Sequence, residues 1–329
     1  MKKRVFSGIQ PSGNVHIGNY LGAIKNWVGI QNEYDSMFCV VDWHALTIYQ
    51  KPEILRQKIR DAVVLLLAAG LDPERCIIFV QSHVKEHAEL AWILNTLTPL
   101  GELERMTQFK DKSLKQKSNI NAGLLDYPVL MAADIVLYNT DAVPVGEDQR
   151  QHVELARVIA RKFNNLYGET FVEPQEIIRK EGARIMSLAD PNRKMSKSDT
   201  DKMGCIDLLD SPDEIREKIK KAVTDSGKDI VFGPDKPAIS NLLTIYSLFS
   251  GQEIKAVENK FSGKSYNEFK EELAEVVVKG LEPFQKKYAE IKSDEKFVDK
   301  VITEGAKKAR ALASPKMEEV RKKVGLDLP

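Results

Sequence analysis

The sequence has few cysteines, almost no net charge and no long hydrophobic segment, and each shortage argues against a class of protein. Three cysteines among 329 residues, with no C-x-x-C pair, do not support a disulfide scaffold, a zinc site or an iron–sulfur site. We therefore expect Cys39, Cys76 and Cys205 to be buried free thiols, and we expect no metal held by protein side chains alone. A net charge of +1 does not indicate a broadly basic surface, so an RNA partner would need a local basic face.

Membrane and export signals are also missing. No run of 18 apolar residues is present, which argues against a membrane span. The first residues, Met-Lys-Lys-Arg-Val-Phe-Ser-Gly, lack the apolar segment of a secretory signal. With the free thiols, these features predict a cytoplasmic protein. A content of 43% hydrophobic and 29% charged residues is typical of a globular chain, and the length predicts two domains.

Strand-like and helix-like segments alternate over the first part of the chain, which predicts a parallel sheet with crossover helices. Strands are expected at 5–9, 36–42, 76–80, 142–145 and 184–188. Helices are expected from about residue 18 and at 52–69, 86–97, 126–139 and 147–167. Ligands of such sheets bind beyond the carboxyl ends of the strands, and the turn at residues 10–13 lies at such an end.

The character of the chain changes after Asp210, where helical periodicity dominates and lysine and glutamate are frequent. We expect helices at 212–225, 238–249, 252–260, 265–290 and 294–323. This pattern predicts a first domain over residues 1–206 and a helical second domain over 207–329. The first domain would contain a connecting insertion at about 99–140, whose less regular part carries Lys110 and Lys112.

Two short segments have the composition of a nucleotide site. Pro11-Ser12-Gly13-Asn14-Val15-His16-Ile17-Gly18-Asn19 leads into a helix, whose first N–H groups suit a phosphate. Gly18 lets an adenine or ribose approach the backbone, while His16 and Asn19 could donate to phosphate oxygens. Lys194-Met195-Ser196-Lys197-Ser198 places two lysines three residues apart, which suits a pyrophosphate that is gripped and released. The alternatives are a plain strand-turn-helix junction and a solvated basic loop.

Two further features point to a substrate. Gly146-Glu147-Asp148-Gln149 follows a strand and opens a helix, so it could hold ribose hydroxyls or an α-amino group, or simply cap the helix. Tyr127, Met131, Asp134 and Tyr138 share one helix face. A carboxylate in an apolar stripe needs a donor, and an indole N–H only donates, so a slot ending in Asp134 fits tryptophan. The alternative is a structural salt bridge.

Taken together, these segments resemble the bacterial tryptophanyl-tRNA synthetases, a family of class I aminoacyl-tRNA synthetases. The likeness runs through essentially the whole chain and weakens after about residue 250. Asn19 replaces the second histidine of the common His-x-Gly-His pattern. The resemblance implies a Rossmann-like α/β catalytic domain and a C-terminal α-helical domain that binds the anticodon.

The resemblance also implies three sets of site residues. Tryptophan would contact Phe6, Gln10, His44, Tyr127, Met131, Asp134, Val143, Val145 and Gln149. ATP would contact Gln10, Pro11, Ser12, Gly18, Asn19, Gly146, Glu147, Asp148, Ile185, Lys194, Met195, Ser196, Lys197 and Ser198. The catalytic groups would be Lys194, Lys197, Lys112, His16 and Asn19. From the residues alone, a structural role for His44 and a solvated loop around Lys112 remain open.

The implied reaction is that of an ATP-dependent, AMP-forming tryptophan–tRNA ligase. L-Tryptophan and ATP would give tryptophanyl-adenylate and pyrophosphate, and the tryptophan would pass to the 3′ end of tRNA(Trp). Mg²⁺ would accompany the phosphates without dedicated protein ligands, and the protein would be a homodimer with no DNA or membrane partner. Candidate tRNA contacts are Lys218, Lys220, Lys221, Lys307 and Lys308. The alternatives are a tyrosyl-tRNA synthetase, a small-molecule nucleotidylyltransferase and a non-catalytic RNA-binding paralogue.

Overall fold

A computed structural model describes residues 2–11, 15–110, 120–146, 149–177, 184–196 and 202–328. The chain divides into two compact units, each of which is assembled from separate stretches of sequence. Unit 1 comprises Met1–Pro11, Gly29–Arg179 and Asp294–Pro329, and unit 2 comprises Ser12–Val28 and Lys180–Ser293.

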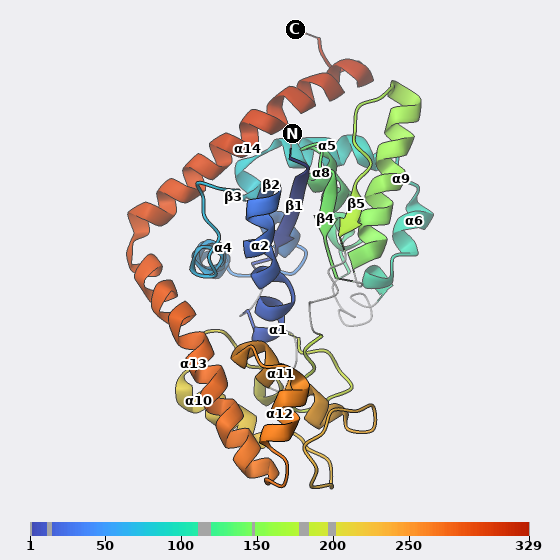
Figure 1. Cartoon of the computed structure of the whole chain (residues 1–329). Helices are drawn as coiled ribbons and strands as arrows, with labels where there is room; N and C mark the ends of the chain where they lie inside the picture. The colour runs from blue at the N-terminus through green and yellow to red at the C-terminus, as the bar shows by residue number, and fades with distance from the viewer. Residues whose placement is uncertain are drawn as a thin grey trace. The chain divides into compact units, whose positions relative to one another are not determined.

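Unit 1 is built on a five-stranded parallel sheet in the order β3-β2-β1-β4-β5 (Figure 1). The central strand β1 (Arg4–Ile9) pairs with β2 (Asp35–Val40) in a register that sets Val5 beside Ser36. The other strands are β3 (Ile77–Val80), β4 (Ala142–Pro144) and β5 (Gln175–Ile177). Helices cover the faces of the sheet, so the middle strands read as continuous apolar runs, and the predicted α/β class is confirmed.

Helices of unit 1 follow the predicted segments closely. Pro52 opens α4, and Gly70, with φ of +106°, follows its end in a backbone conformation that favours glycine. The helix α6 in the predicted connecting insertion was not expected. The helices are α2 (Lys25–Glu33, shared between the units), α3 (Asp42–Ala45), α4 (Pro52–Ala68), the 3₁₀ turn η2 (Gln81–His83), α5 (Glu86–Asn95), α6 (Leu100–Glu104), α8 (Ala122–Val136), α9 (Arg150–Tyr167) and α14 (Glu295–Val324).

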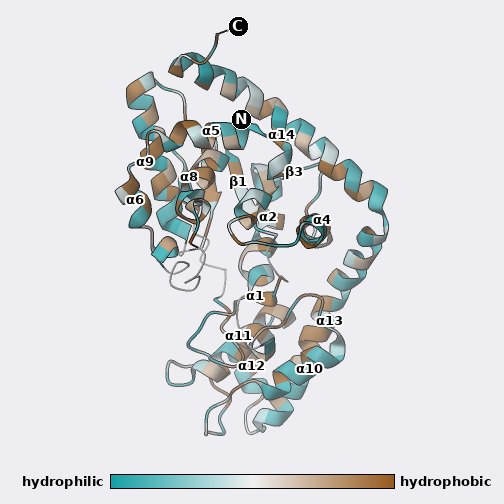
Figure 2. Ribbon diagram, turned by 180° about the vertical axis from the view of Figure 1, so that it is seen from behind, coloured by the Kyte–Doolittle hydropathy of each residue, from teal (hydrophilic) through white to brown (hydrophobic). Residues whose placement is uncertain are grey.

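The core of unit 1 gathers around α8. Val129, Ala132, Ala133 and Val136 of this helix are fully buried, and they belong to one apolar cluster with residues of β1, α5 and α9. Figure 2 shows the hydrophobic colouring of α8 inside the unit. A helix that is apolar on most of its surface must be enclosed on most sides, which explains the central place of α8.

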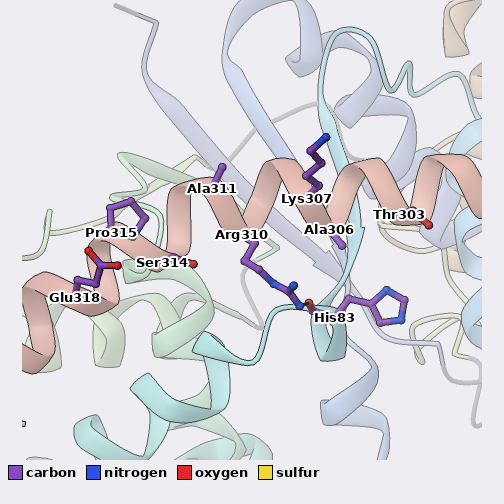
Figure 3. A pocket seen from close by; sticks show the side chains of 9 residues that line it. All are labelled: His83, Thr303, Ala306, Lys307, Arg310, Ala311, Ser314, Pro315 and Glu318. Atoms are coloured by element: carbon purple, nitrogen blue, oxygen red, sulfur yellow. Dashed lines mark hydrogen bonds between the residues drawn. The ribbon is translucent and has the colours of Figure 1, made fainter. Parts of the chain in front are cut away.

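The last helix, α14, packs against the edge strand β3. Gly305 comes so close to the strand that an added Cβ would lie 1.8 Å from the carbonyl oxygen of Ile78. Arg310 donates from Nη2 to the carbonyl oxygen of His83 at 2.6 Å, and Figure 3 shows the side chain reaching toward that residue along a groove of about 750 Å³. The helix therefore covers an edge that would otherwise expose unpaired backbone groups.

Unit 2 is helical apart from isolated bridges within its described residues. Its core contains the buried rings of Tyr246, Phe261 and Phe269, whose centroids lie 4.9–6.2 Å apart. The elements are α1 (Ile17–Asn19), the π-helix η1 (Tyr20–Ile24), the 3₁₀ turn η4 (Lys202–Gly204), α10 (Pro212–Lys221), α11 (Pro237–Ser250), α12 (Ile254–Lys260) and α13 (Tyr266–Ser293). The predicted helices after Asp210 are confirmed.

The strand expected at 184–188 is wrong. That segment forms only an isolated antiparallel bridge between Met186 and Lys194, and the fifth strand of the sheet is Gln175–Ile177. Ile185 and Leu188 are buried, but their neighbours belong to unit 2. An apolar run in the sequence predicts that a segment is buried, but it does not identify the neighbouring elements that bury it.

The contacts of the chain also differ from the expected division at residues 206 and 207. Met317 and Val320 of α14 are buried in the same cluster as α8 and α9, so the end of the chain belongs to unit 1. The stretch from Lys180 groups instead with the helices of unit 2.

Two other sequence expectations concern cysteines and membrane spans. All three cysteines are free and buried, as predicted. Burial raises the pKa of Cys76 and that of Cys205 to about 12, so both are thiols at neutral pH. In the ranges that the structure describes, no helix has both the length and the apolar character needed to cross a membrane.

Candidate active site

The buried carboxylate of Asp134 is the centre of a polar cluster in unit 1. It lies on α8 and is 1% exposed. Gln81 Nε2 donates to Oδ1 at 2.7 Å, and His87 Nδ1 lies 2.6 Å from the same oxygen. His44 Nε2 lies 2.8 Å from Oδ2. The sequence predicted an acid that needs a partner, and the structure supplies donors from η2, α5 and α3.

The cluster keeps Asp134 ionised. Burial by itself would raise the pKa of this carboxyl group, but the hydrogen bonds from His44 and His87 outweigh that effect and hold the pKa below its usual range. Gln81 and His87 were not predicted as site residues. Gln81 follows the end of β3, at the carboxyl edge of the sheet, and that position could have identified it. His87 carries no comparable signal in the sequence.

The apolar residues predicted to wall an indole lie together in unit 1. Phe6 on β1 and Val143 on β4 are buried in the cluster around α8, and Met131 and Val145 pack against that cluster while partly exposed. The ring of Phe6 stacks on Tyr138, with centroids 5.9 Å apart and an interplanar angle of 12°. The structure therefore places all four predicted wall residues in, or packed against, the same apolar cluster.

Three of the four polar residues predicted around the amino acid also meet in unit 1. The ring of His44 lies edge-on to Tyr127, with centroids 6.1 Å apart, and Gln10 Nε2 donates to the carbonyl oxygen of His44 at 2.9 Å. Tyr127 places its hydroxyl 3.0 Å from Nε2 of His152, a buried residue of α9 that the sequence did not single out. Burial raises the pKa of Tyr127, so its hydroxyl stays protonated. Gln149 precedes α9, and its N–H donates to the carbonyl oxygen of Gly146.

In unit 2, His16 and Asn19 cap the start of α1 reciprocally. His16 Nδ1 accepts from the backbone N–H of Asn19 at 3.3 Å, and Asn19 Oδ1 accepts from the backbone N–H of His16 at 3.4 Å. Because Nδ1 is an acceptor, the ring proton of neutral His16 lies on Nε2. The capping role supports, in part, the alternative that this segment is a plain strand-turn-helix junction. Because the ring proton lies on Nε2, any hydrogen bond from His16 to a phosphate would come from Nε2.

Gly18 is an ordinary helical residue whose missing side chain leaves room for the ring of His16. A Cβ at this position would lie 2.9 Å from His16 Nδ1. We expect Gly18→Ala to displace that ring, break the reciprocal cap and lower the free energy of unfolding by about 1 kcal/mol, measured by urea denaturation.

The matched control for this substitution is Gly22→Ala in the same segment, where an added Cβ would have no neighbour within 4 Å. This variant is expected to be as stable as the unmodified chain or slightly more so. Equal losses in both variants would show that the ring of His16 is not the cause.

The lysine-bearing segment is anchored in unit 2 by backbone pairing. Met195 N–H donates to the carbonyl oxygen of Ile185 at 3.0 Å. Asn241 of α11 brackets Met186, accepting from its N–H and donating to its carbonyl oxygen, each at 2.9 Å. Asn241 is buried and was not predicted. Its side chain makes the two backbone hydrogen bonds that a neighbouring strand would otherwise make, which explains how residues 184–188 are held outside the sheet.

The two nucleotide signatures meet within unit 2. Ile17 N–H donates to the carbonyl oxygen of Ile206 at 3.0 Å, and a Cβ at Gly18 would lie 3.5 Å from Cβ of Ile185. Ile185 in turn pairs with Met195, as described above. Stretches of chain that are far apart in sequence are therefore adjacent here, as the two-signature hypothesis requires.

Several predicted site residues lie outside the described part of the chain. These are Ser12, Lys112, Glu147, Asp148, Lys197 and Ser198. Of the lysines considered for tRNA, Lys218 is buried and pairs with Asp210 at 2.5 Å, and Lys308 donates to the carbonyl oxygen of Pro73. Within the described ranges, no cluster of three or more His, Cys, Asp or Glu side chains is arranged to hold a metal ion.

Sequence comparison identifies close relatives over the full length. A family model for class I tRNA synthetases (W and Y) matches residues 1–282. The tryptophan–tRNA ligase of Wolinella succinogenes is 53% identical over 326 residues, which cover 99% of this chain and 99% of that protein. The tryptophan–tRNA ligase of Caldanaerobacter subterraneus subsp. tengcongensis is 56% identical over 327 residues, again 99% of each.

Solved structures agree with the sequence relatives. The tryptophanyl-tRNA synthetase of Mycoplasma pneumoniae superposes with a TM-score of 0.91 at 37% identity, covering 99% of this chain and 98% of that one. The enzyme of Campylobacter jejuni, solved with ADP and tryptophan, gives a TM-score of 0.86 at 38% identity and covers 98% and 100%. With its sheet, its adjoining signatures and its full-length relatives, the chain belongs to the class I tRNA synthetase family of the tryptophan (W) and tyrosine (Y) enzymes.

Proposed function

We propose that this protein is a tryptophan–tRNA ligase that activates L-tryptophan with ATP and transfers it to tRNA(Trp). The observation that carries the choice of amino acid is Asp134, a buried, ionised carboxylate on a helix that is packed in the apolar core of unit 1. Full-length identity of 53–56% to tryptophan–tRNA ligases and the ADP- and tryptophan-bound relative support the same assignment.

Tryptophan binds in unit 1 in this proposal. Phe6, Met131, Val143 and Val145 contact the indole, and its N–H donates to Asp134. Tyr127, Gln149, Gln10 and His44 surround the amino and carboxylate groups. A pocket of this kind rejects smaller side chains because they leave space unfilled and leave the buried carboxylate without its donor.

The residues proposed to contact ATP are those that the family resemblance implies. Among the described residues they are Gln10, Pro11, His16, Gly18, Asn19, Gly146, Ile185, Lys194, Met195 and Ser196. Lys112 and Lys197, with Ser12, Glu147, Asp148 and Ser198, complete the proposed set. The lysines offset the charge of the phosphates, and Mg²⁺ accompanies those phosphates without dedicated protein ligands.

The chemistry needs no nucleophile from the protein. The tryptophan carboxylate attacks the α-phosphorus of ATP and pyrophosphate leaves. A terminal ribose hydroxyl of the tRNA then attacks the carbonyl carbon of the adenylate, and AMP leaves. Both steps depend on positioning and on stabilisation of phosphate charge, which suits lysines, amides and helix N–H groups.

The remaining assignments follow the family. We propose that the protein acts in the cytoplasm as a homodimer and that the helical part of the chain contacts the anticodon region of tRNA(Trp). Lys220 and Lys307 are exposed, so either could contact a phosphate. Lys218 is excluded from that role because its ammonium group is buried against Asp210.

Amino-acid-dependent pyrophosphate exchange tests this function. We expect exchange with tryptophan and none above background with tyrosine, because the hydrogen-bond acceptor of the proposed pocket, Asp134, is positioned to accept from an indole N–H. Charging of tRNA(Trp) in the same preparation is the second measurement. Exchange that prefers tyrosine would assign the other branch of the family, and ATP turnover without tRNA charging would favour a nucleotidylyltransferase.

A further inference from the structure

Asp134 has nearly all of its hydrogen-bonding capacity in use. A carboxylate offers about four acceptor positions, two on each oxygen. Oδ1 receives Gln81 and His87, at 2.7 and 2.6 Å, and is therefore saturated. Oδ2 receives only His44, at 2.8 Å, among the described residues. One acceptor position remains, and it is on Oδ2.

The two contacts of the His87 ring nitrogens select one tautomer of the neutral ring. Its Nδ1 faces the carboxylate of Asp134, and its Nε2 lies 2.7 Å from the hydroxyl of Tyr138. In the neutral ring only one nitrogen carries a proton, and a lone pair on Nδ1 would repel the carboxylate. The proton therefore lies on Nδ1, and Tyr138 donates its hydroxyl proton to Nε2.

The ring of His87 is held on all sides. It is 0% exposed, and its centroid lies 5.4 Å from that of Tyr138 and 5.9 Å from that of Phe79. Tyr138 stacks in turn on Phe6. His44, which lies 2.8 Å from Oδ2, is 9% exposed. The carboxylate is thus fixed through Oδ1, and its remaining acceptor position lies on Oδ2.

We propose that His87 is a positioning residue for amino-acid recognition: with Gln81 it occupies Oδ1 of Asp134, so that Oδ2, shared with His44, is the oxygen that accepts the indole N–H. This inference rests on the proposed function, and it names the oxygen and the residue that make the amino-acid site selective for tryptophan. His87 does not contact the substrate, and it acts by orienting the residue that does.

The test compares two substrates in pyrophosphate exchange: tryptophan and its benzothiophene analogue, in which sulfur replaces the indole N–H. We expect His87→Leu to raise KM for tryptophan by about tenfold or more and to change kcat little, because the lost hydrogen bond forms before the reaction. KM for the analogue should stay nearly constant, because the analogue donates nothing to Oδ2.

Two variants separate orientation from folding. His87→Asn keeps an N–H donor near the position of Nδ1 and should restore most of the selectivity for tryptophan. Tyr138→Phe keeps the ring stacked on Phe6 but removes the donor to Nε2, and it should give an intermediate loss. If His87→Leu does not fold, these two variants still measure the effect.

The outcomes are distinct from those that test the function. If the unmodified protein shows no tryptophan-dependent exchange, both the proposed function and this inference are refuted. If the unmodified protein prefers tryptophan over the analogue and His87→Leu keeps that preference, only the inference is refuted. The same holds if His87→Leu raises KM equally for both substrates. A ¹⁵N spectrum of labelled histidine showing the His87 proton on Nε2 would also overturn it.

Discussion

Replacing Asp134 with alanine is expected to lower kcat/KM for tryptophan in pyrophosphate exchange by about 100-fold, mostly through KM. A hydrogen bond to a charged group contributes about 1.5–3 kcal/mol, and each 1.4 kcal/mol corresponds to about a factor of ten. The bond to the indole is formed in the ground state as well as in the transition state, so its loss appears mainly in KM. Steady-state exchange over a range of tryptophan concentrations measures both constants.

The substitution also leaves Gln81, His44 and His87 without their shared acceptor, so stability must be measured beside activity. Asp126→Ala is a matched control. Asp126 lies on the same helix, is half-exposed and accepts a hydrogen bond from Asn95 rather than from the cluster around Asp134. Activity of Asp134→Ala equal to that of Asp126→Ala would refute the assignment of Asp134 as the indole acceptor.

A second large effect is expected from Gly305→Ala on stability. The new Cβ would lie 1.8 Å from the carbonyl oxygen of Ile78 and 2.8 Å from its carbonyl carbon. Backbone atoms of β3 cannot rotate away as a side chain can, so α14 must move off the strand. Overpacking of this kind costs about 3 kcal/mol or more, which exceeds the gain of about 1 kcal/mol from replacing a helical glycine. Urea unfolding, with hydrogen exchange at β3, measures the loss.

Gly101→Ala provides the comparison, because Gly101 also lies in a helix of unit 1 and an added Cβ there has no neighbour within 4 Å. That variant should be unchanged or slightly stabilised. If Gly305→Ala were as stable as Gly101→Ala, with unchanged protection of β3, the close approach of α14 to the strand would be refuted.

The success of the sequence predictions for the fold depended on burial. Short apolar runs between breakers located β1, β2 and β3 to within one or two residues, and the helical period located the helices after Asp210. The same signal failed for β5. Gln175–Ile177 is a short edge strand with no buried residue, so it has no apolar run to detect. Ile185 and Leu188 gave a strand-like run because unit 2 buries them.

The sequence predictions for the candidate site also succeeded in some respects and failed in others. The sequence indicated that Asp134 required a hydrogen-bond donor and that the two nucleotide signatures belonged together. It did not indicate that His16 and Asn19 would cap each other, since a cap depends on the backbone geometry at the start of α1. The roles of the site residues in catalysis stay predictions that the experiments above address.

Residue types and their spacing were enough to specify the α/β class, the helical second half and the need of one buried acid for a partner. The donors that meet this need come from three separate segments at Gln81, His44 and His87, and only folding makes them neighbours. The attachment of α14 to unit 1 has a similar cause. An amphipathic helix specifies that one of its faces is buried, but the surface that covers this face is chosen by the shape of the whole chain, here by the room that Gly305 leaves for β3.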